Sequence, residues 1–299
     1  MTPPVKSGFV TFIGRPNVGK STLLNAMVGQ KVSITSRKPQ TTRHRIMGVS
    51  TKEHGQIVYI DTPGLHLGKG RIINRFMNRT ASGALHGVDC IVMLIAATGW
   101  QKADQRVVEL FQNQEIPVVL AINKMDLLKR REDLLPLIEE SNRRFDFTEI
   151  IPVSAVKRTN LNPLEAILLQ LLPEQRPLFA ADQLTDRSER FMAAELVREQ
   201  IFRKMGQEIP YAVAVEIEQF KTKKKVLHIN ALIWVEKTGQ KAIIIGKGGE
   251  RLKKIGIAAR QEMETFFTKK VNLGLWVKVR GGWSDNERAL RSFGYADGD

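Results

Sequence analysis

The sequence predicts an α/β domain, in which helices flank a mostly parallel sheet, followed by a smaller α+β domain. Its 299 residues exceed the usual size of a single domain, and its 42% hydrophobic and 26% charged residues are typical of a folded protein. Short apolar runs alternate with helical patterns in the first part of the chain, and the order of elements changes after about residue 174.

The first part contains short, nearly continuous apolar runs, which predict strands buried on both faces. These runs lie at residues 8–13, 57–60, 90–97, 118–122 and 149–153. Helical patterns separate most of them, at residues 21–28, 72–85, 103–113 and 134–144. Because parallel strands need crossover connections, this alternation favours a parallel sheet with helices on its faces.

The boundary between the domains is predicted after a further helical pattern at residues 163–172, where Pro173 and Pro177 interrupt the periodicity. We therefore expect a first domain, a linker and a second domain with a C-terminal tail, at residues 1–174, 175–186 and 187–299. The elements predicted in the second domain are a helix at 187–205, strands at 211–220 and 226–235, a glycine-rich turn, a helix at 250–267 and a strand at 271–279. Trp234 and Trp276 are expected in its core, and Lys223 to Lys225 at a solvated hairpin tip.

The charge and the cysteine content restrict the partners and the compartment. A formal net charge of +15 and a pI near 10.0 favour contact with a polyanion, either nucleic acid or an anionic membrane surface. The single cysteine, Cys90, fits a reducing compartment. Since the N-terminus lacks the apolar core of a signal peptide and no run approaches the roughly 18 apolar residues of a membrane span, we expect a cytoplasmic protein. Attachment to a membrane surface stays open.

Residues 14–21, GRPNVGKS, fit the phosphate-loop motif Gly-x-x-x-x-Gly-Lys-Ser and stand between a predicted strand and a predicted helix. The glycines let backbone N–H groups surround a phosphate, Lys20 can reach the outer phosphates, and Ser21 can supply a hydroxyl to Mg²⁺. The nucleotide contacts expected here are Gly14, Arg15, Pro16, Asn17, Val18, Gly19, Lys20, Ser21 and Thr22.

Residues 61–64, Asp-Thr-Pro-Gly, follow the strand at 57–60. An aspartate at the carboxyl end of that strand can face the metal, usually through water, and the Gly64 N–H can meet the terminal phosphate. Alone, these residues would be only a turn sequence. After a phosphate loop, they predict further contacts at Asp61, Thr62, Pro63 and Gly64.

Residues 123–126, Asn-Lys-Met-Asp, follow the strand at 118–122 and predict which base is bound. Asp126 can accept from both N1–H and the 2-amino group of guanine, whereas adenine would leave the carboxylate unpaired, a discrimination of about 10⁴-fold or more. Asn123 would brace the neighbouring loops, and the stem of Lys124 would cover one face of the base. The backbone at Ser154 and Ala155 can offer an N–H to guanine O6.

These elements, in this order, resemble the GTP-binding domain of the Ras-like GTPases of the translation-factor-related class, over about residues 7–174. The resemblance implies hydrolysis of GTP to GDP and phosphate by in-line attack of water. It implies GTP or GDP and Mg²⁺ as cofactors. The catalytic residues that it implies are Lys20, Thr42, Asp61 and Gly64, and the metal-holding residues are Ser21, Thr42 and Asp61.

Thr42 and Leu65 are the two positions that bear on the rate of hydrolysis. Within the polar loop at residues 40–44, Thr42 is preferred to Thr41 on the resemblance alone. Leu65 stands where Ras-like enzymes place a water-orienting glutamine, and its side chain cannot form a hydrogen bond. We therefore expect slow unassisted hydrolysis, on the order of 10⁻⁴ to 10⁻² s⁻¹.

The glycine-rich turn of the second domain, Gly246-Lys247-Gly248-Gly249, precedes a cationic amphipathic helix. Glycines let an RNA backbone approach closely, and the cations can meet its phosphates. With its neighbouring elements, the turn resembles that of the type II KH RNA-binding domain, over about residues 187–282. Propensity favours a strand at residues 242–245, whereas the KH resemblance implies a short helix. The expected RNA contacts are Gly246, Lys247, Gly248, Gly249, Arg251, Lys253 and Lys254.

With one GTPase-like domain, one KH-like domain and the segments at residues 40–44, 184–191 and 288–295, the chain resembles the bacterial Era GTPase family over its whole length. That resemblance implies a monomeric GTP-dependent factor for assembly of the small ribosomal subunit, which binds 16S rRNA near its 3′ end through the KH domain, and peripheral contact with the inner membrane. Two alternatives stay open: an RNA-binding module with a purely structural nucleotide site, and a regulatory GTPase whose basic surface meets lipid rather than RNA. The motifs at Lys20 and Gly246 favour the GTP-dependent, RNA-binding assembly factor over both of these alternatives.

Overall fold

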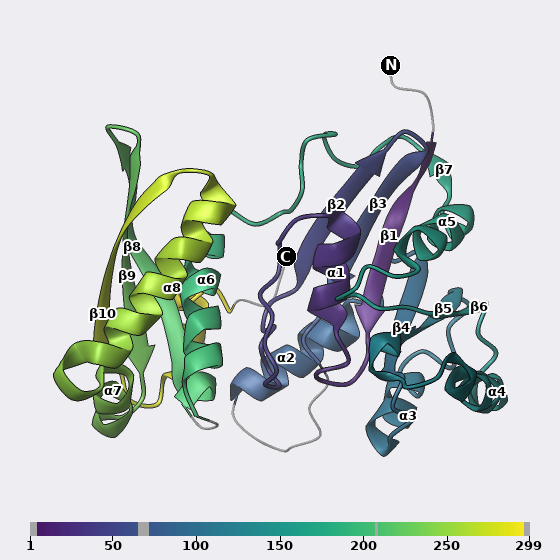
Figure 1. Ribbon diagram of the computed structural model, residues 1–299, viewed down its shortest axis with the longest axis horizontal. Helices are drawn as coiled ribbons and strands as arrows, with labels where there is room; N and C mark the ends of the chain where they lie inside the picture. Colours follow the sequence, from purple (N-terminus) through teal and green to yellow (C-terminus); the bar gives the residue numbers. More distant parts are fainter. Residues whose placement is uncertain (1–4, 65–71, 207–208, 296–299) are drawn as a thin grey trace. The chain divides into compact units, whose positions relative to one another are not determined.

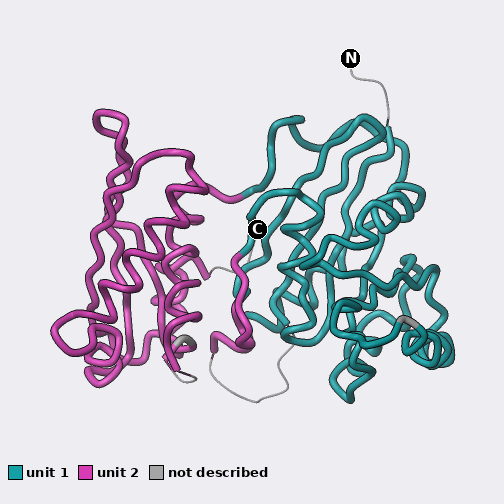
Figure 2. Tube along the Cα trace, in the orientation of Figure 1, with its two compact units in different colours: residues 1–33, 42–67, 77–186 teal, residues 34–41, 68–76, 187–299 magenta. Residues whose placement is uncertain are grey.

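The structure, a computed structural model, describes residues 5–64, 72–206 and 209–295 (Figure 1). Contacts divide the chain into two compact units (Figure 2). Unit 1 comprises residues 1–33, 42–67 and 77–186, and unit 2 comprises residues 34–41, 68–76 and 187–299. Unit 2 therefore includes two short segments that precede residue 187. Leu65 lies outside the described residues.

Unit 1 is built on a mixed sheet with the strand order β2-β3-β1-β4-β5-β6, to which β7 adds by pairing with β1. The pairs β3-β1, β1-β4, β4-β5 and β5-β6 are parallel, whereas β2 runs antiparallel to β3 and β7 antiparallel to β1. The strands are β1 Val5–Ile13, β2 Ile46–Lys52, β3 Gly55–Asp61, β4 Cys90–Ala96, β5 Val118–Asn123, β6 Glu149–Pro152 and β7 Glu174–Gln175.

Helices and short turns connect these strands, as the alternation of patterns predicts. The helices are α1 Lys20–Val28, α2 Ile72–Gly83, α3 Lys102–Val108, α4 Leu134–Arg144 and α5 Leu161–Leu171, with 3₁₀ turns at Met125–Leu127 and Arg131–Asp133. Every residue of β4 and β5 is buried, because helices cover both faces of a central parallel strand. The Cys90 thiol lies in this core. The expected α/β fold is confirmed, with the carboxyl ends of β1, β3 and β5 carrying the motif residues.

Two features of unit 1 were not predicted. Strand β2 mixes apolar with small and polar residues, so its pattern is weak, although it pairs along its whole length with β3. The segment 175–186, expected to be a linker, belongs to unit 1. Gln56 accepts hydrogen bonds from the backbone N–H groups of Leu178 and Phe179, at 2.7 and 2.9 Å, and Thr185 forms a bridge to Gly48.

Unit 2 contains an α+β module with the element order α6-β8-β9-α7-α8-β10. Its sheet has the order β10-β9-β8, with β8 and β9 antiparallel and β9 and β10 parallel. Apolar side chains of α6, α8 and one face of the sheet form its core. The elements are α6 Glu189–Lys204, β8 Val213–Lys223, β9 Val226–Val235, α7 Thr238–Ile245, α8 Glu250–Phe267 and β10 Lys270–Val279.

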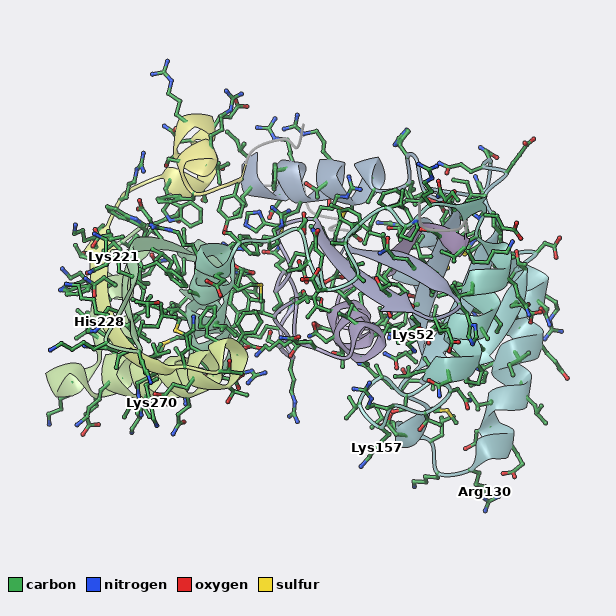
Figure 3. All side chains as sticks on the ribbon, turned by 90° about the horizontal axis from the view of Figure 1, so that it is seen from above. Lys52, Arg130, Lys157, Lys221, His228 and Lys270 are labelled. Atoms are coloured by element: carbon green, nitrogen blue, oxygen red, sulfur yellow. The ribbon has the colours of Figure 1, made fainter. Side chains whose placement is uncertain are left out.

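At residues 242–245, propensity predicts a strand and the KH resemblance predicts a short helix, and the structure has the helix α7 there. Its β-branched residues favour a strand, yet Thr238–Ile245 is helical, since Ile244 must pack into the core beside α8. The expected solvated hairpin tip is also present, with Lys223 to Lys225 exposed. Near that tip, Lys221 pairs in register with His228, and Lys270 belongs to the neighbouring strand (Figure 3).

The end of the chain differs from the expected tail. Trp283 is fully buried and donates to Ala212 O at 3.3 Å. Its ring stacks with Tyr295 and meets Phe293 edge to face, beside α9 Glu287–Ser292. The expectation for Trp276 was wrong, because this side chain is 49% exposed on β10. Within the described ranges, no helix has the length and apolarity that crossing a membrane requires.

Candidate functional site

The phosphate loop connects β1 to α1 in unit 1. Three of its residues have left-handed backbone angles: Gly14 (φ 152°), Asn17 (φ 65°) and Gly19 (φ 106°). A Cβ on Gly14 would stand 2.5 Å from the carbonyl oxygen of Leu94, and one on Gly19 would stand 2.3 Å from Asn123 Nδ2. Both positions therefore need glycine for conformation and for space.

The Lys20 side chain curls across this loop. Its Nζ donates to Gly14 O at 2.8 Å and to Arg15 O at 3.2 Å, so two carbonyl oxygens of the loop hold the ammonium. Burial lowers the pKa of Lys20 to about 8, and the nearby Asp61 carboxylate opposes that shift. A phosphate placed here would restore the environment that a charged ammonium prefers.

Three oxygen-bearing side chains meet beside Lys20. Ser21 Oγ lies 2.6 Å from Asp61 Oδ2 and 2.8 Å from Thr42 Oγ1, and Thr42 Oγ1 lies 3.4 Å from the same carboxylate oxygen. The structure thus brings Thr42 to this group, whereas the Thr41 hydroxyl bonds to Ser36 and to Lys38 O.

The chemistry of this group suits Mg²⁺, which prefers hard oxygen ligands. Asp61 is fully buried, and its Oδ1 has no hydrogen-bond partner among the described residues. Burial raises the pKa of Asp61, against the hydrogen bond from Ser21 and the charge of Lys20. A cation or its bound water would satisfy Oδ1 and restore the carboxylate. Ser33, which the sequence did not single out, also donates to Asp61 Oδ2, at 2.9 Å.

Gly64 lies against the phosphate loop. A Cβ at this position would approach three atoms of Pro16 at 3.0–3.1 Å, so the turn after β3 and the turn after β1 are in close contact. The neighbouring Thr62 hydroxyl donates to Phe12 O at 3.0 Å, which fixes the start of this turn. The motif at 61–64 is therefore placed where its backbone can meet the ligand of the phosphate loop.

Asn123 joins the base-binding motif to the phosphate loop. Its Nδ2 donates to Val18 O at 2.8 Å, and its Oδ1 accepts from Ala155 N at 3.1 Å. Asn123 thus links the phosphate loop to the loop at residues 154–155, as the predicted bracing role requires. Lys124 adds a second connection through Nζ to Asn17 O at 2.6 Å.

Asp126 is exposed at the surface of this region, and Ser154 Oγ donates to its Oδ1 at 2.5 Å. This bond orients the carboxylate and gives Ser154 a function that the motif did not suggest. The N–H of Ser154 is bonded to Thr159 O at 3.2 Å, so the N–H of Ala155 is the better placed of the two for guanine O6. It would exchange its bond to Asn123 for the base, or share it.

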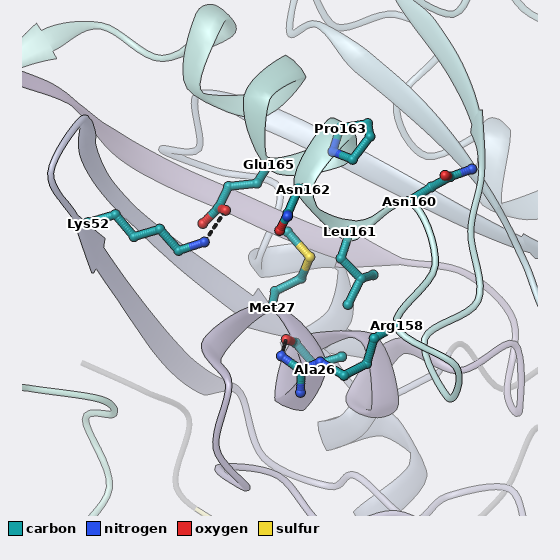
Figure 4. A pocket seen from close by; sticks show the side chains of 9 residues that line it. All are labelled: Ala26, Met27, Lys52, Arg158, Asn160, Leu161, Asn162, Pro163 and Glu165. Carbon is teal, nitrogen blue, oxygen red and sulfur yellow. Dashed lines mark hydrogen bonds and ion pairs between the residues drawn. The ribbon is translucent and has the colours of Figure 1, made fainter.

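The loop that carries Ser154 is anchored from behind. Arg158 and Asn160 have left-handed φ angles of 56° and 57°, and Arg158 Nη2 donates to Ala26 O of α1 at 3.0 Å. Figure 4 shows the pocket beside this bond, with Lys52 paired to Glu165 on its other side. This pocket is separate from the residues that meet at Lys20.

The phosphate loop has one further partner that no motif indicates. Arg15 Nε donates to Asp104 Oδ2 at 3.1 Å, and Asp104 is fully buried at the start of α3. Burial raises the pKa of Asp104, while Arg15 opposes the shift. The two residues are 89 positions apart, so only the fold brings them together.

In unit 2, the glycine-rich turn separates α7 from α8. Gly246, Gly248 and Gly249 have φ angles of 73°, 61° and 82°, so three of its four residues adopt the left-handed backbone that favours glycine. Lys247, Lys253 and Lys254 are exposed, whereas Arg251 Nη1 donates back to Ile243 O at 3.2 Å.

A shallow pocket of about 410 Å³ follows this turn along α8 and β10. Its floor is apolar and its rim carries two cations, a combination that suits nucleobases joined by phosphates. Only Gly249 and Lys253 of its lining were predicted. The lining residues are Gly249, Leu252, Lys253, Gly256, Ile257, Arg260, Leu273 and Leu275. Gly256, a glycine inside a helix, was the available signal, since a Cβ there would lie 3.3 Å from Leu275.

Comparison with known proteins finds relatives of both parts of the chain. Residues 9–124 match the family described as 50S ribosome-binding GTPase, and residues 208–284 match the KH domain. GTPase Era of Marinobacter nauticus is 54% identical over 295 residues, covering 99% of this chain and 97% of that protein. GTPase Era of Pseudomonas aeruginosa is 54% identical over 292 residues, covering 98% and 96%.

Solved structures give the same result. The crystal structure of an Aquifex aeolicus Era variant bound to GDP.AlF4- has a TM-score of 0.94 and 41% identity, covering 98% of this chain and 100% of that one. A crystal structure of Era in complex with MgGDPNP and nucleotides 1506–1542 of 16S ribosomal RNA also has a TM-score of 0.94 and 41% identity, covering 98% and 99%. The predicted GTPase activity and the predicted cofactors, GTP or GDP and Mg²⁺, are thereby confirmed at the level of the family. The chain belongs to the Era family of GTPases, with a GTPase domain followed by a KH domain.

Proposed function

We propose that this chain is a GTP-hydrolysing switch that binds 16S rRNA near its 3′ end and acts in assembly of the small ribosomal subunit. The observation that supports the nucleotide part best is the convergence of five separate segments of the chain. Asn123 bonds to Val18 and Ala155, and Ser21, Thr42 and Asp61 meet beside Lys20. The KH module and the Era complex with a 16S rRNA segment support the RNA part.

In the reaction, the phosphate loop and Lys20 would hold the β- and γ-phosphates, with Lys20 leaving the carbonyls of Gly14 and Arg15 for the phosphate oxygens. Ser21, Thr42 and Asp61 would hold Mg²⁺, which supplies neutralisation of the charge on the phosphate oxygens. The Gly64 N–H would meet the terminal phosphate. Catalysis is then a matter of positioning and electrostatics, without a covalent intermediate.

The base would lie beside Asp126, which is already oriented by Ser154. The phosphates, ribose and base would be contacted by the residues predicted from the motifs at 14–22, 61–64, 123–126 and 154–155. Asp126→Asn should lower the affinity for GDP by about 10²-fold or more and raise that for xanthosine diphosphate, because an amide offers a donor in place of the second acceptor. Asp133→Asn, an exposed residue with the same change in charge, is the control. Unchanged base preference in Asp126→Asn would contradict the assigned contact.

The RNA would cross the turn at Gly246 and the pocket along α8, with bases on Leu252, Ile257 and Leu275 and phosphates at the lysines of the turn and of α8. Binding of an oligonucleotide from the 3′ end of 16S rRNA, measured with GDP and with a nonhydrolysable GTP analogue, tests this part. Residues 34–41 precede Thr42, residues 68–76 follow Gly64, and both segments group with the C-terminal module. We therefore infer that GTP favours RNA binding.

The monomeric state, the cytoplasmic location and the peripheral contact with the inner membrane remain proposals. The charge of +15 supports attraction to anionic lipid as well as to RNA. Sedimentation with vesicles of phosphatidylglycerol and phosphatidylethanolamine, with and without competing RNA, separates the two partners. Binding to vesicles that RNA does not reduce would favour the alternative of a membrane-surface GTPase.

A further inference from the structure

Helix α6 of unit 2 buries several polar side chains. The relative exposures of Glu195, Arg198, Glu199 and Gln200 are 5%, 1%, 0% and 4%. A buried charged group is costly unless it is paired and hydrogen-bonded. Two of these side chains, Arg198 and Glu199, form hydrogen bonds with the segment 34–41.

Arg198 and Glu195 form a bidentate pair, with Nε–Oε1 and Nη2–Oε2 distances of 2.7 and 2.6 Å. Burial alone would lower the pKa of Arg198, but the Glu195 carboxylate raises it, so the guanidinium stays charged. The remaining hydrogen of Nη2 is donated to the carbonyl oxygen of Thr41 at 2.5 Å. A charged donor thus holds one backbone atom of the segment 34–41.

The other end of this segment is held in the same way. Glu199 Oε1 accepts from the backbone N–H of Thr35 at 3.0 Å and from Arg203 Nη2 at 2.8 Å. Between the two ends, Lys38 Nζ donates to the carbonyl oxygens of Met205 and Gly206, just after α6. The segment 34–41 is therefore held at three places, two on α6 and one on the residues that follow it.

This segment leads directly into Thr42. The Cα atoms of Thr41 and Thr42 are about 3.8 Å apart, as across any trans peptide. The Thr42 hydroxyl lies 2.8 Å from Ser21 Oγ and 3.4 Å from Asp61 Oδ2. Because hydrogen bonds weaken steeply beyond these distances, a shift of the Thr41 carbonyl by about 1 Å would remove Thr42 from the group.

We propose that Arg198 and Glu199 of α6 are positioning residues that hold Thr42 beside Ser21 and Asp61, so that the first helix of the RNA-binding module controls binding of the nucleotide that carries a terminal phosphate. This inference rests on the proposed function of the two sites. The inference names Arg198 and Glu199 as the residues that couple the affinity for RNA to the affinity for GTP.

The test uses the full-length double variant Glu195→Gln/Arg198→Met, which removes both charges together and leaves no carboxylate buried without its partner. We expect its affinity for MgGDPNP to fall about tenfold, as for loss of one hydrogen bond from a charged donor, and its affinity for MgGDP to stay within about twofold of wild type. Arg190→Met is the matched control. Arg190 also lies on α6 and donates to a backbone oxygen at 2.5 Å, but to Ile217 of β8.

A second readout separates positioning from a general loss of structure. In the wild type, MgGDPNP should strengthen binding of the 16S rRNA oligonucleotide relative to MgGDP, and in the double variant this ratio should fall to about one. Unchanged MgGDPNP affinity, or equal losses for both nucleotides, would overturn the proposal. Failure of the wild type to bind GDPNP or RNA would instead refute the proposed function.

Discussion

Asn123→Ala tests whether one amide holds the nucleotide site together. The substitution leaves two buried groups without partners, the carbonyl oxygen of Val18 and the N–H of Ala155, which are bonded to Asn123 at 2.8 and 3.1 Å. Each buried group left unpaired costs about 1–3 kcal/mol. The free energy of unfolding of unit 1 should therefore fall by about 2–6 kcal/mol, and the affinity for GDP should fall as well.

The assay is urea denaturation followed by circular dichroism, with and without saturating GDP. The transition that GDP shifts to higher urea reports on unit 1, because ligand binding stabilises only the unit that holds the site. Asn162→Ala, at an exposed position of α5, should change the free energy of unfolding by less than about 0.5 kcal/mol. A loss of less than about 1 kcal/mol in Asn123→Ala would refute the reasoning, since the two bonds would then contribute little.

Three further predictions follow from burial and charge. Trp283→Ala should lower the free energy of unfolding of unit 2 by about 3–5 kcal/mol, whereas Trp276→Ala should cost less than about 1 kcal/mol, because the first side chain is fully buried and the second 49% exposed; thermal melts of both variants check this. Burial, with a smaller effect of Asp89, raises the pKa of Cys90 from 9.0 to about 12. The folded protein should therefore react with a thiol reagent at pH 8 no faster than it unfolds, and rapid labelling of the native protein would be inconsistent with the buried position. Because the thiol ionises at lower pH in the unfolded chain, the free energy of unfolding should also fall as the pH rises above about 9. The double change Lys247→Asp with Gly248→Asp should weaken RNA binding and reduce its salt dependence while leaving GDP affinity unchanged, as filter binding at several salt concentrations can show.

Motif residues of the nucleotide site could be predicted from the sequence because each motif is local. A strand, a sharp turn and a helix fix Gly14 and Lys20 relative to one another, and the parallel sheet brings the carboxyl ends of β1, β3 and β5 together. The choice of Thr42 over Thr41 came from family resemblance, and the structure brings the Thr42 hydroxyl to within 2.8 Å of Ser21 Oγ.

The partners of those residues could not be predicted in this way. Ser33 and Asp104 bond to Asp61 and Arg15 only because the fold brings them close, across 28 and 89 positions of sequence. Strand β2 was missed because its pattern is weak, although its partner β3 is buried throughout. The error at Trp276 has a related cause, since one face of a small sheet with helices on its other face can stay in solvent.

The grouping of residues 34–41 and 68–76 with the C-terminal module has a consequence for dissecting the protein. The chain passes from one compact unit to the other after residues 33, 41, 67, 76 and 186, so a cut at 186 severs only the last of five passages. A fragment ending there would keep Ile34 and Phe76, both buried in the intact chain, without the residues that cover them. Expressed alone, each half would expose apolar surface and tend to aggregate, and its measured affinities would underestimate those of the whole.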